Sequence, residues 1–90
     1  MKFEWDENKS RSNLAKHGIA FDEAKTVFDD PLYVEFYDPA HSVNEDRYLA
    51  LEQSDRQRLL VVSHTRRENS IRLISARKAT RKERKNYEEG

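Results

Sequence analysis

The chain has 90 residues, and 38% of them are charged, with equal numbers of acidic and basic side chains. A chain of this length supports one hydrophobic core, so we expect a single domain over residues 1–90. The absence of cysteine excludes disulfides, thiolate metal sites and thiol nucleophiles. The apolar run at residues 59–62 is too short to cross a bilayer, and the N-terminus lacks the apolar segment of a signal peptide. We therefore expect a cytoplasmic protein that does not contact membranes.

The charge is unevenly distributed along the chain. Residues 1–40 carry 5 Lys or Arg against 9 Asp or Glu. Residues 56–85 carry 11 basic side chains, most of them arginine, and their only acidic residues are Glu68 and Glu83. The planar fork of arginine suits bidentate contacts with phosphate. This basic segment favours a nucleic-acid partner, and a solvated surface without such a function is the alternative.

The start of the chain predicts a short strand and a capped helix. Phe3 and Trp5 alternate with polar neighbours, which is typical of a strand. Asp6 can cap a helix that extends to about His17, and Gly18 can end that helix in a left-handed turn. This opening segment contains no glycine-rich phosphate loop.

The rest of the chain predicts a second helix, a sheet and a third helix. Apolar side chains at helical spacing predict a helix over residues 21–28, and alternation predicts a strand over residues 32–37. Three further β-rich runs are joined by short polar connections: residues 45–51, 58–65 and 71–77. Thr80 and Glu83 form a capping box that starts a last helix reaching about Glu89. We expect an α+β domain in which two N-terminal helices and a short C-terminal helix pack on an antiparallel sheet.

The three β-rich runs carry residues that suit phosphate chemistry. Turns centred near residues 54 and 68 would place Leu49 opposite Leu60, and both Glu45 and Arg72 opposite His64. One face would then be apolar at one end and polar at the other. The polar end is formed by Glu45, Arg47, His64 and Arg72, with Arg77 near the end of its strand.

RNA cleavage without a metal requires a base for the 2′-hydroxyl, an acid for the 5′-oxygen and cations for the phosphorane. In this interpretation Glu45 is the base, His64 is the acid, and the phosphate is held by three arginines: Arg47, Arg72 and Arg77. Structural alternatives are an ion pair between Glu45 and Arg47 and a half-buried His64. Three other basic residues are expected to contact RNA phosphates: Arg67, Lys78 and Arg81.

A metal or cofactor site is not expected. The three histidines are scattered along the sequence. Asp38 and His41 are possible ligand types, but they lie in one loop without further donors nearby. We therefore expect a reaction carried by side chains alone.

Several motifs, in this order, resemble the BrnT family of type II toxins over nearly the whole chain. They are FEWDE at 3–7, NLAKHG at 13–18 with Phe21, VFDDP at 27–31, EDRY at 45–48, and IRLISAR at 71–77 with Ala79, Arg81, Glu83, Arg84 and Tyr87. The resemblance implies a RelE-like ribonuclease fold and an endoribonuclease that cleaves RNA and arrests growth. It also implies a BrnA-type antitoxin with a ribbon-helix-helix part. The two proteins would form a heterotetramer that contacts DNA only through the antitoxin.

Two positions depart from the family pattern, and two other functions stay open. Ala20 stands where a capping side chain is common, and the turn at residues 66–69 lacks glycine, which leaves Asn69 as the expected positive-φ residue. A non-catalytic RNA- or ribosome-binding module would bind RNA and leave it intact. A pure partner-binding module would bind a protein and have no affinity for RNA.

Overall fold

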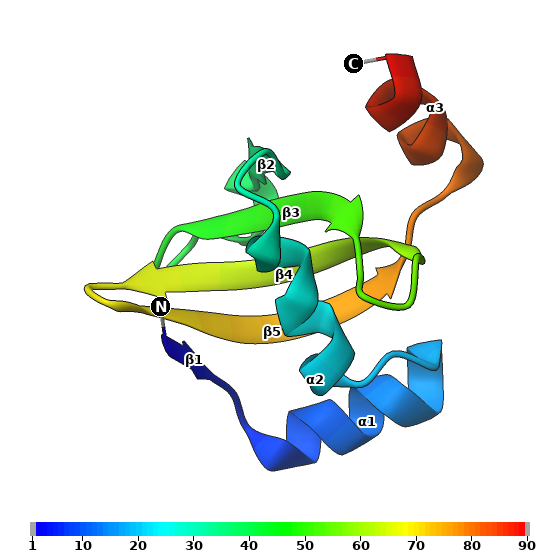
Figure 1. Cartoon of the computed structure of the whole chain (residues 1–90). Coiled ribbons are helices and arrows are strands. Elements are labelled where there is room, and N and C mark those ends of the chain that lie inside the picture. The colour runs from blue at the N-terminus through cyan, green and yellow to red at the C-terminus, as the bar shows by residue number, and fades with distance from the viewer. Residues whose placement is uncertain (1, 90) are drawn as a thin grey trace.

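The computed structural model, which describes residues 2–89, shows a five-stranded sheet with two helices on one side and a third on the other (Figure 1). The strands are β1 (Lys2–Glu4), β2 (Val34–Tyr37), β3 (Arg47–Gln53), β4 (Leu59–Arg67) and β5 (Ser70–Lys78). Their order across the sheet is β1-β5-β4-β3-β2. β1 is parallel to β5, and all other neighbours are antiparallel. The α+β class is confirmed, but the sheet is mixed, because the long connection between β1 and the other strands permits parallel pairing.

The helical segments are α1 (Glu7–His17), α2 (Phe21–Ala24) and α3 (Arg81–Glu89), with two 3₁₀ helices, η1 (Lys25–Asp29) and η2 (Pro39–His41). As predicted, the Asp6 carboxylate caps α1 by accepting from the Asn8 amide at 2.8 Å, and Gly18 ends it at φ 73°. The second predicted helix is wrong in length, because α2 tightens into η1 after four residues. Ala20 supplies no cap, and the Thr26 hydroxyl donates to the Glu23 carbonyl at 2.7 Å, which suits the tighter turn.

α1, α2 and η1 lie against one side of the sheet, here named the covered face (Figure 1). Phe21 is fully buried there, with the Trp5 ring edge-on at 6.0 Å. The buried core between the helices and the sheet consists of Ile19, Phe21, Ala24, Val27, Ala50, Leu60, Val62, Ile71, Leu73 and Ala76. This core is the larger of the two in the described residues and fixes the helices on the sheet.

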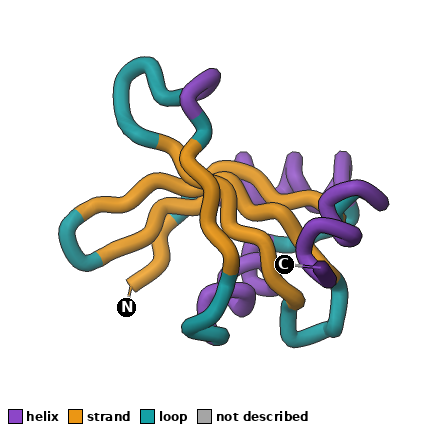
Figure 2. Tube along the Cα trace, turned by 90° about the horizontal axis from the view of Figure 1, so that it is seen from above, coloured by secondary structure: helices purple, strands orange, loops and turns teal. Residues whose placement is uncertain are grey.

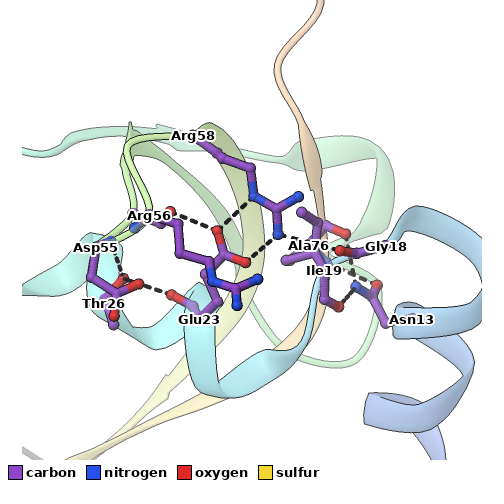
Figure 3. Close-up of polar contacts among 10 residues, drawn as sticks. Asn13, Gly18, Ile19, Glu23, Thr26, Asp55, Arg56, Arg58 and Ala76 are labelled. Atoms are coloured by element: carbon purple, nitrogen blue, oxygen red, sulfur yellow. Dashed lines mark hydrogen bonds and ion pairs between the residues drawn. The ribbon is translucent and has the colours of Figure 1, made fainter.

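Polar groups buried on the covered face are paired with one another (Figure 3). Glu23 is only 7% exposed and forms an ion pair with Arg58, whose Nε donates to Oε2 at 2.9 Å. The Ser54 hydroxyl donates to the same oxygen at 2.6 Å. The hydrogen bonds from Arg58 outweigh burial and lower the pKa of Glu23. Glu23 therefore remains ionised at neutral pH.

Asn13 joins the helices to the sheet (Figure 3). Its Nδ2 donates to the carbonyl of Ile19 at 2.8 Å and to that of Ala76 at 2.9 Å. Its Oδ1 accepts from the Ala76 amide at 3.0 Å. Nearby, Arg58 also donates to the Gly18 carbonyl at 3.3 Å. These bonds connect the end of α1 to β5 and to the loop before α2.

The opposite side of the sheet, here named the open face, has α3 at one end (Figure 2). Tyr87 of α3 packs on a small apolar cluster: Leu51, Leu59 and Val61, with Leu49 and Ala79. The Tyr87 hydroxyl donates to the Glu52 carboxylate at 2.8 Å. The predicted capping box is confirmed, with the Thr80 amide 2.8 Å from Glu83 Oε1 and the Glu83 amide 3.1 Å from Thr80 Oγ1. No described helix is both long and apolar enough to cross a membrane.

The strand register decides which side chains share a face. Leu49 lies opposite Ser63, and Arg72 lies opposite Thr65, so the predicted pairings of Leu49 with Leu60 and of His64 with Arg72 are wrong. Glu45 precedes β3 and has no cross-strand partner in the sheet, so its predicted pairing with His64 is also wrong. The β3–β4 turn centres near residue 56, so each β3 residue lies opposite a β4 residue three positions later than expected.

Two turns and one bulge set this register. The Ser54 amide donates to the Arg58 carbonyl at 2.8 Å, and the residue before Arg58, Gln57, adopts φ 62°. Sequence analysis placed this turn too early, because no glycine marks the position with positive φ. In the β4–β5 turn Glu68, and not Asn69, has positive φ, at 32°. The pairing of β4 with β5 shifts between Ser63 and His64, which leaves Ile74 as an extra residue in β5.

Candidate active site

The open face carries a band of polar side chains across its three long strands. Arg47 on β3 and Arg72 on β5 flank Thr65 on β4. Neighbouring strands are about 4.8 Å apart, so the backbones of the two arginines are separated by roughly 10 Å. The next two cross-strand rows are Leu49, Ser63 and Ser75, then Leu51, Val61 and Arg77. Three of the five predicted catalytic residues, Arg47, Arg72 and Arg77, therefore lie on this face.

The three arginines differ in their pairing. Arg77 donates two hydrogen bonds to the Glu83 carboxylate of α3, at 2.8 and 3.0 Å. These bonds raise the pKa of Arg77 and lower the pKa of Glu83 to about 2. Within residues 2–89, no ion pair joins Arg47 or Arg72 to a carboxylate. Two uncompensated guanidinium groups are therefore available to a ligand with negative charge.

A depression of about 360 Å³ lies over this band of side chains. Its lining from the sheet is Arg47, Leu49, Ser63, Ile74, Ser75 and Arg77. Asp38 and His41 complete it from the connection between β2 and β3, with His41 Nδ1 2.9 Å from Asp38 Oδ2. Sequence analysis considered these two residues only as metal ligands. In the sequence they are marked only by their spacing of three residues, shortly before the EDRY motif at 45–48.

Glu45 lies beside this depression. Its carboxylate is 3.7 Å from Arg67 Nη2, so its ion-pair partner is Arg67 and not Arg47 as the structural alternative proposed. Glu45 also lines an adjoining hollow, of about 320 Å³, with His41 and Arg47. The structure thus brings Glu45 close to the predicted arginines through a loop, without the predicted strand pairing.

His64 lies on the covered face, away from the arginines. It is 0% exposed, its ring is edge-on to Phe28 with centroids 4.9 Å apart, and its two nitrogens face the Val62 carbonyl and the Glu35 carboxylate at 3.1 Å. Burial lowers the pKa of His64, opposed by these two hydrogen bonds. The prediction that His64 shares a face with Arg47 is wrong, because the register differs by an odd number of residues.

The three predicted phosphate-binding residues are all exposed. Arg67 lies at the end of β4 and approaches Glu4 and Glu45, each at 3.7 Å. Lys78 ends β5, and Arg81 begins α3. They lie at opposite ends of the long strands, with Arg67 beside the β4–β5 turn and the other two at the α3 end.

A larger hollow, of about 500 Å³, lies at the β4–β5 turn. Its lining is Lys2, Arg66, Glu68, Asn69, Ser70 and Ile71. This set contains no histidine, and Arg66 is already paired with Glu35. The depression on the open face differs because it combines an imidazole with two guanidinium groups, which are groups that transfer protons and bind phosphate.

Comparisons with known proteins agree with this arrangement of motifs. A family model described as "Ribonuclease toxin, BrnT, of type II toxin-antitoxin system" matches residues 5–83. The chain belongs to this family. Among solved structures, the Brucella abortus ribonuclease toxin BrnT is 26% identical, with a TM-score of 0.70 over 90% of this chain and 99% of that chain. A search of curated proteins finds no match.

Family membership confirms the resemblance that the sequence motifs indicated. It identifies the chain as a member of a ribonuclease toxin family of type II toxin–antitoxin systems, which implies an RNA substrate and an antitoxin partner. The match spans β3, β4 and β5 and therefore includes the arginines of the open face.

Proposed function

We propose that the protein is a metal-independent endoribonuclease toxin of RelE-like fold, which cleaves RNA at the open face and thereby arrests growth. The observation that carries the proposal is the pair of arginines, Arg47 and Arg72, that flank Thr65 without an acidic partner in residues 2–89. The family supplies the substrate class. The geometry of the open face supports a site for a phosphate group.

The three arginines serve the phosphate in two ways. Arg47 and Arg72 approach a phosphate from both sides and stabilise the negative charge that grows as the 2′-oxygen attacks phosphorus. Arg77 lies two cross-strand rows away from Arg47 and Arg72 and adds a third positive charge. Glu83 holds its guanidinium in place. Loss of one such charge stabiliser typically lowers the rate by about 100- to 1,000-fold.

The remaining predicted residues lie beside the phosphate site or outside it. Glu45 stays a candidate base because it adjoins the depression through the hollow that it shares with Arg47. Arg67, Lys78 and Arg81 contact phosphates on either side of the cleaved one. His64 is left out of the catalytic set, because its buried ring does not reach the open face.

The test is cleavage of labelled single-stranded RNA in EDTA by the wild type and by Arg47→Ala and Arg72→Ala. Arg56→Ala is the matched control, since Arg56 is an exposed arginine in the β3–β4 turn. We expect wild-type cleavage, a loss of about 100-fold or more in each open-face variant, and no change in the control. An RNA that stays intact but bound would instead support the non-catalytic binding module.

We further propose that the antitoxin partner is of BrnA type, with a ribbon-helix-helix part, and that the two proteins form a heterotetramer that contacts DNA through the antitoxin. Exposed apolar side chains near the edge strand β2 support a protein contact: Leu32, Val34, Phe36, Tyr37 and Val43. Native mass spectrometry of the co-expressed pair should show two copies of each chain. Protection of RNA in that complex would show neutralisation.

A further inference from the structure

The loop that carries His41 is fixed to the sheet at its base. The Asp38 amide donates to the Arg47 carbonyl at 2.9 Å. The Ser42 hydroxyl donates to the Asp38 carbonyl at 2.6 Å and accepts from the Arg47 amide at 2.9 Å. These bonds close the connection between β2 and β3, which projects from the sheet (Figure 2). A side chain on η2 therefore has a defined position relative to Arg47.

Asp38 and His41 form a pair in which one member is partly buried and the other is exposed. The Asp38 side chain is 16% exposed, and the His41 ring is 65% exposed. The Asp38 carboxylate accepts a hydrogen bond from Nδ1 of His41 at 2.9 Å. This contact fixes the tautomer in which Nε2 carries the lone pair. Nε2 has no hydrogen-bond partner within residues 2–89.

The charged groups around the His41 ring are few and come from three elements. Asp38 belongs to the same loop, Glu45 lies in the adjoining hollow, and Arg47 and Arg77 lie in the sheet. Both arginines stay cationic over the whole useful pH range. The other polar groups of the depression, Ser63 and Ser75, do not titrate there. Histidine is the one residue type of this set that ordinarily changes charge between pH 5 and 8.

We propose that His41, positioned by Asp38, is the general base of the cleavage reaction in place of Glu45; this inference rests on the function proposed above. Nε2 of the neutral ring accepts the proton of the 2′-hydroxyl as the 2′-oxygen bonds to phosphorus. The P–O5′ bond breaks, and the 5′-oxygen takes a proton from water. The resulting hydroxide recovers the proton from His41. The products are a 2′,3′-cyclic phosphate and a 5′-hydroxyl end.

Asp38 is a positioning residue in this scheme. It does not reach the RNA, but it orients the ring and stabilises the imidazolium that forms when the proton arrives. Replacement by asparagine keeps the size of the side chain and removes its charge. The cleavage rate of Asp38→Asn should fall less than that of His41→Ala. Its pH dependence should move to lower pH, because the imidazolium has lost a negative neighbour.

The experiment compares the pH–rate profiles of the wild type, His41→Ala, His41→Gln and Asp38→Asn between pH 5 and 9, in EDTA. His17→Ala is the control, since His17 lies at the end of α1 on the covered side. We expect a rise with pH in the wild type and in the control. In His41→Ala the rate should fall about 100- to 10,000-fold with unchanged RNA affinity, the rise should disappear, and added imidazole should restore part of the rate.

The outcomes separate this inference from the proposed function. Wild-type cleavage that is lost in Arg47→Ala but is normal, with an unchanged pH profile, in both His41 variants would overturn the role of His41 alone. Absence of cleavage in the wild type would overturn both proposals. A fall in both His41 variants without imidazole rescue and without a change of pH profile would show a structural role and would also overturn the inference.

Discussion

The covered and open faces of the sheet treat their polar groups in opposite ways. On the covered face, buried groups such as Asn13, Glu23 and His64 all have hydrogen-bond partners. On the open face, Arg47 and Arg72 have no acidic partner within residues 2–89, and the buried Thr65 hydroxyl between them has no hydrogen bond there. Satisfied polar networks stabilise a fold, whereas unsatisfied groups are typical of functional sites. The two faces should therefore respond differently to substitution.

The largest change in the free energy of unfolding is expected on substitution of Phe21, which is fully buried between the helices and the sheet. Phe21→Ala should lower the free energy of unfolding by about 3–5 kcal/mol, because it leaves a cavity in the main core. Phe36→Ala on the open face should cost less than about 1 kcal/mol, because Phe36 is half exposed. Urea denaturation measures both values. Equal losses would contradict the assignment of stability to the covered face.

His64→Ala should be the next most destabilising, by about 2–4 kcal/mol, since it removes a buried ring from its packing against Phe28. The folded variant should cleave RNA at the wild-type rate. Thermal unfolding and cleavage under conditions where the variant stays folded test the two statements. A stable His64→Ala protein that no longer cuts would return His64 to the catalytic set.

Glu23→Gln should lower the free energy of unfolding at pH 7 by about 1–3 kcal/mol, because it removes the charge that Arg58 binds. Since the pKa of Glu23 is lowered in the folded protein, its ionisation stabilises the fold above the unfolded pKa. That contribution is lost as the pH falls through the folded value. The difference from the wild type should therefore shrink from pH 7 to pH 3, as denaturation at each pH would show. Asp22→Asn, on the exposed side of α2, is the control.

The smallest change in the free energy of unfolding is expected on substitution of Thr65, and it should be an increase. Thr65→Val replaces an unpaired buried hydroxyl with a methyl group and should raise the free energy of unfolding by about 1 kcal/mol. Cleavage should be unchanged, because Thr65 is only 1% exposed and its buried hydroxyl is out of reach of the RNA. A slower reaction in a more stable variant would add Thr65 to the site.

Local sequence signals predicted most elements of the fold. Asp6 and Gly18 mark the two ends of α1 through their side chain and backbone chemistry, and Thr80 with Glu83 marks the start of α3. The register was not predictable in the same way, because the turn at Gln57 uses a non-glycine residue with positive φ. Pairing of β1 with β5 joins segments about 68 residues apart, beyond the reach of local patterns.

The candidate site was only partly predicted, because the strand register and the loops decide which side chains come together. Arg47, Arg72 and Arg77 were identified from residue type and motif, and the open face brings them together. His64 was selected because it lies in a strand among basic residues, but strand alternation with the wrong turn placed it on the wrong face. His41 was missed because it reaches the depression from a loop, and loop geometry follows from contacts that no periodicity reveals.

The extra residue in β5 governs the arrangement of the arginines. Arg72 and Arg77 are five positions apart, and in a regular strand an odd separation places two side chains on opposite faces. Ile74, the bulge residue between them, restores the parity, so both arginines face outward. The site thus depends on the number of residues in β5 as well as on their identity. A chain shortened by one residue there would keep every proposed catalytic side chain but would turn Arg72 and Arg77 to opposite faces of the sheet.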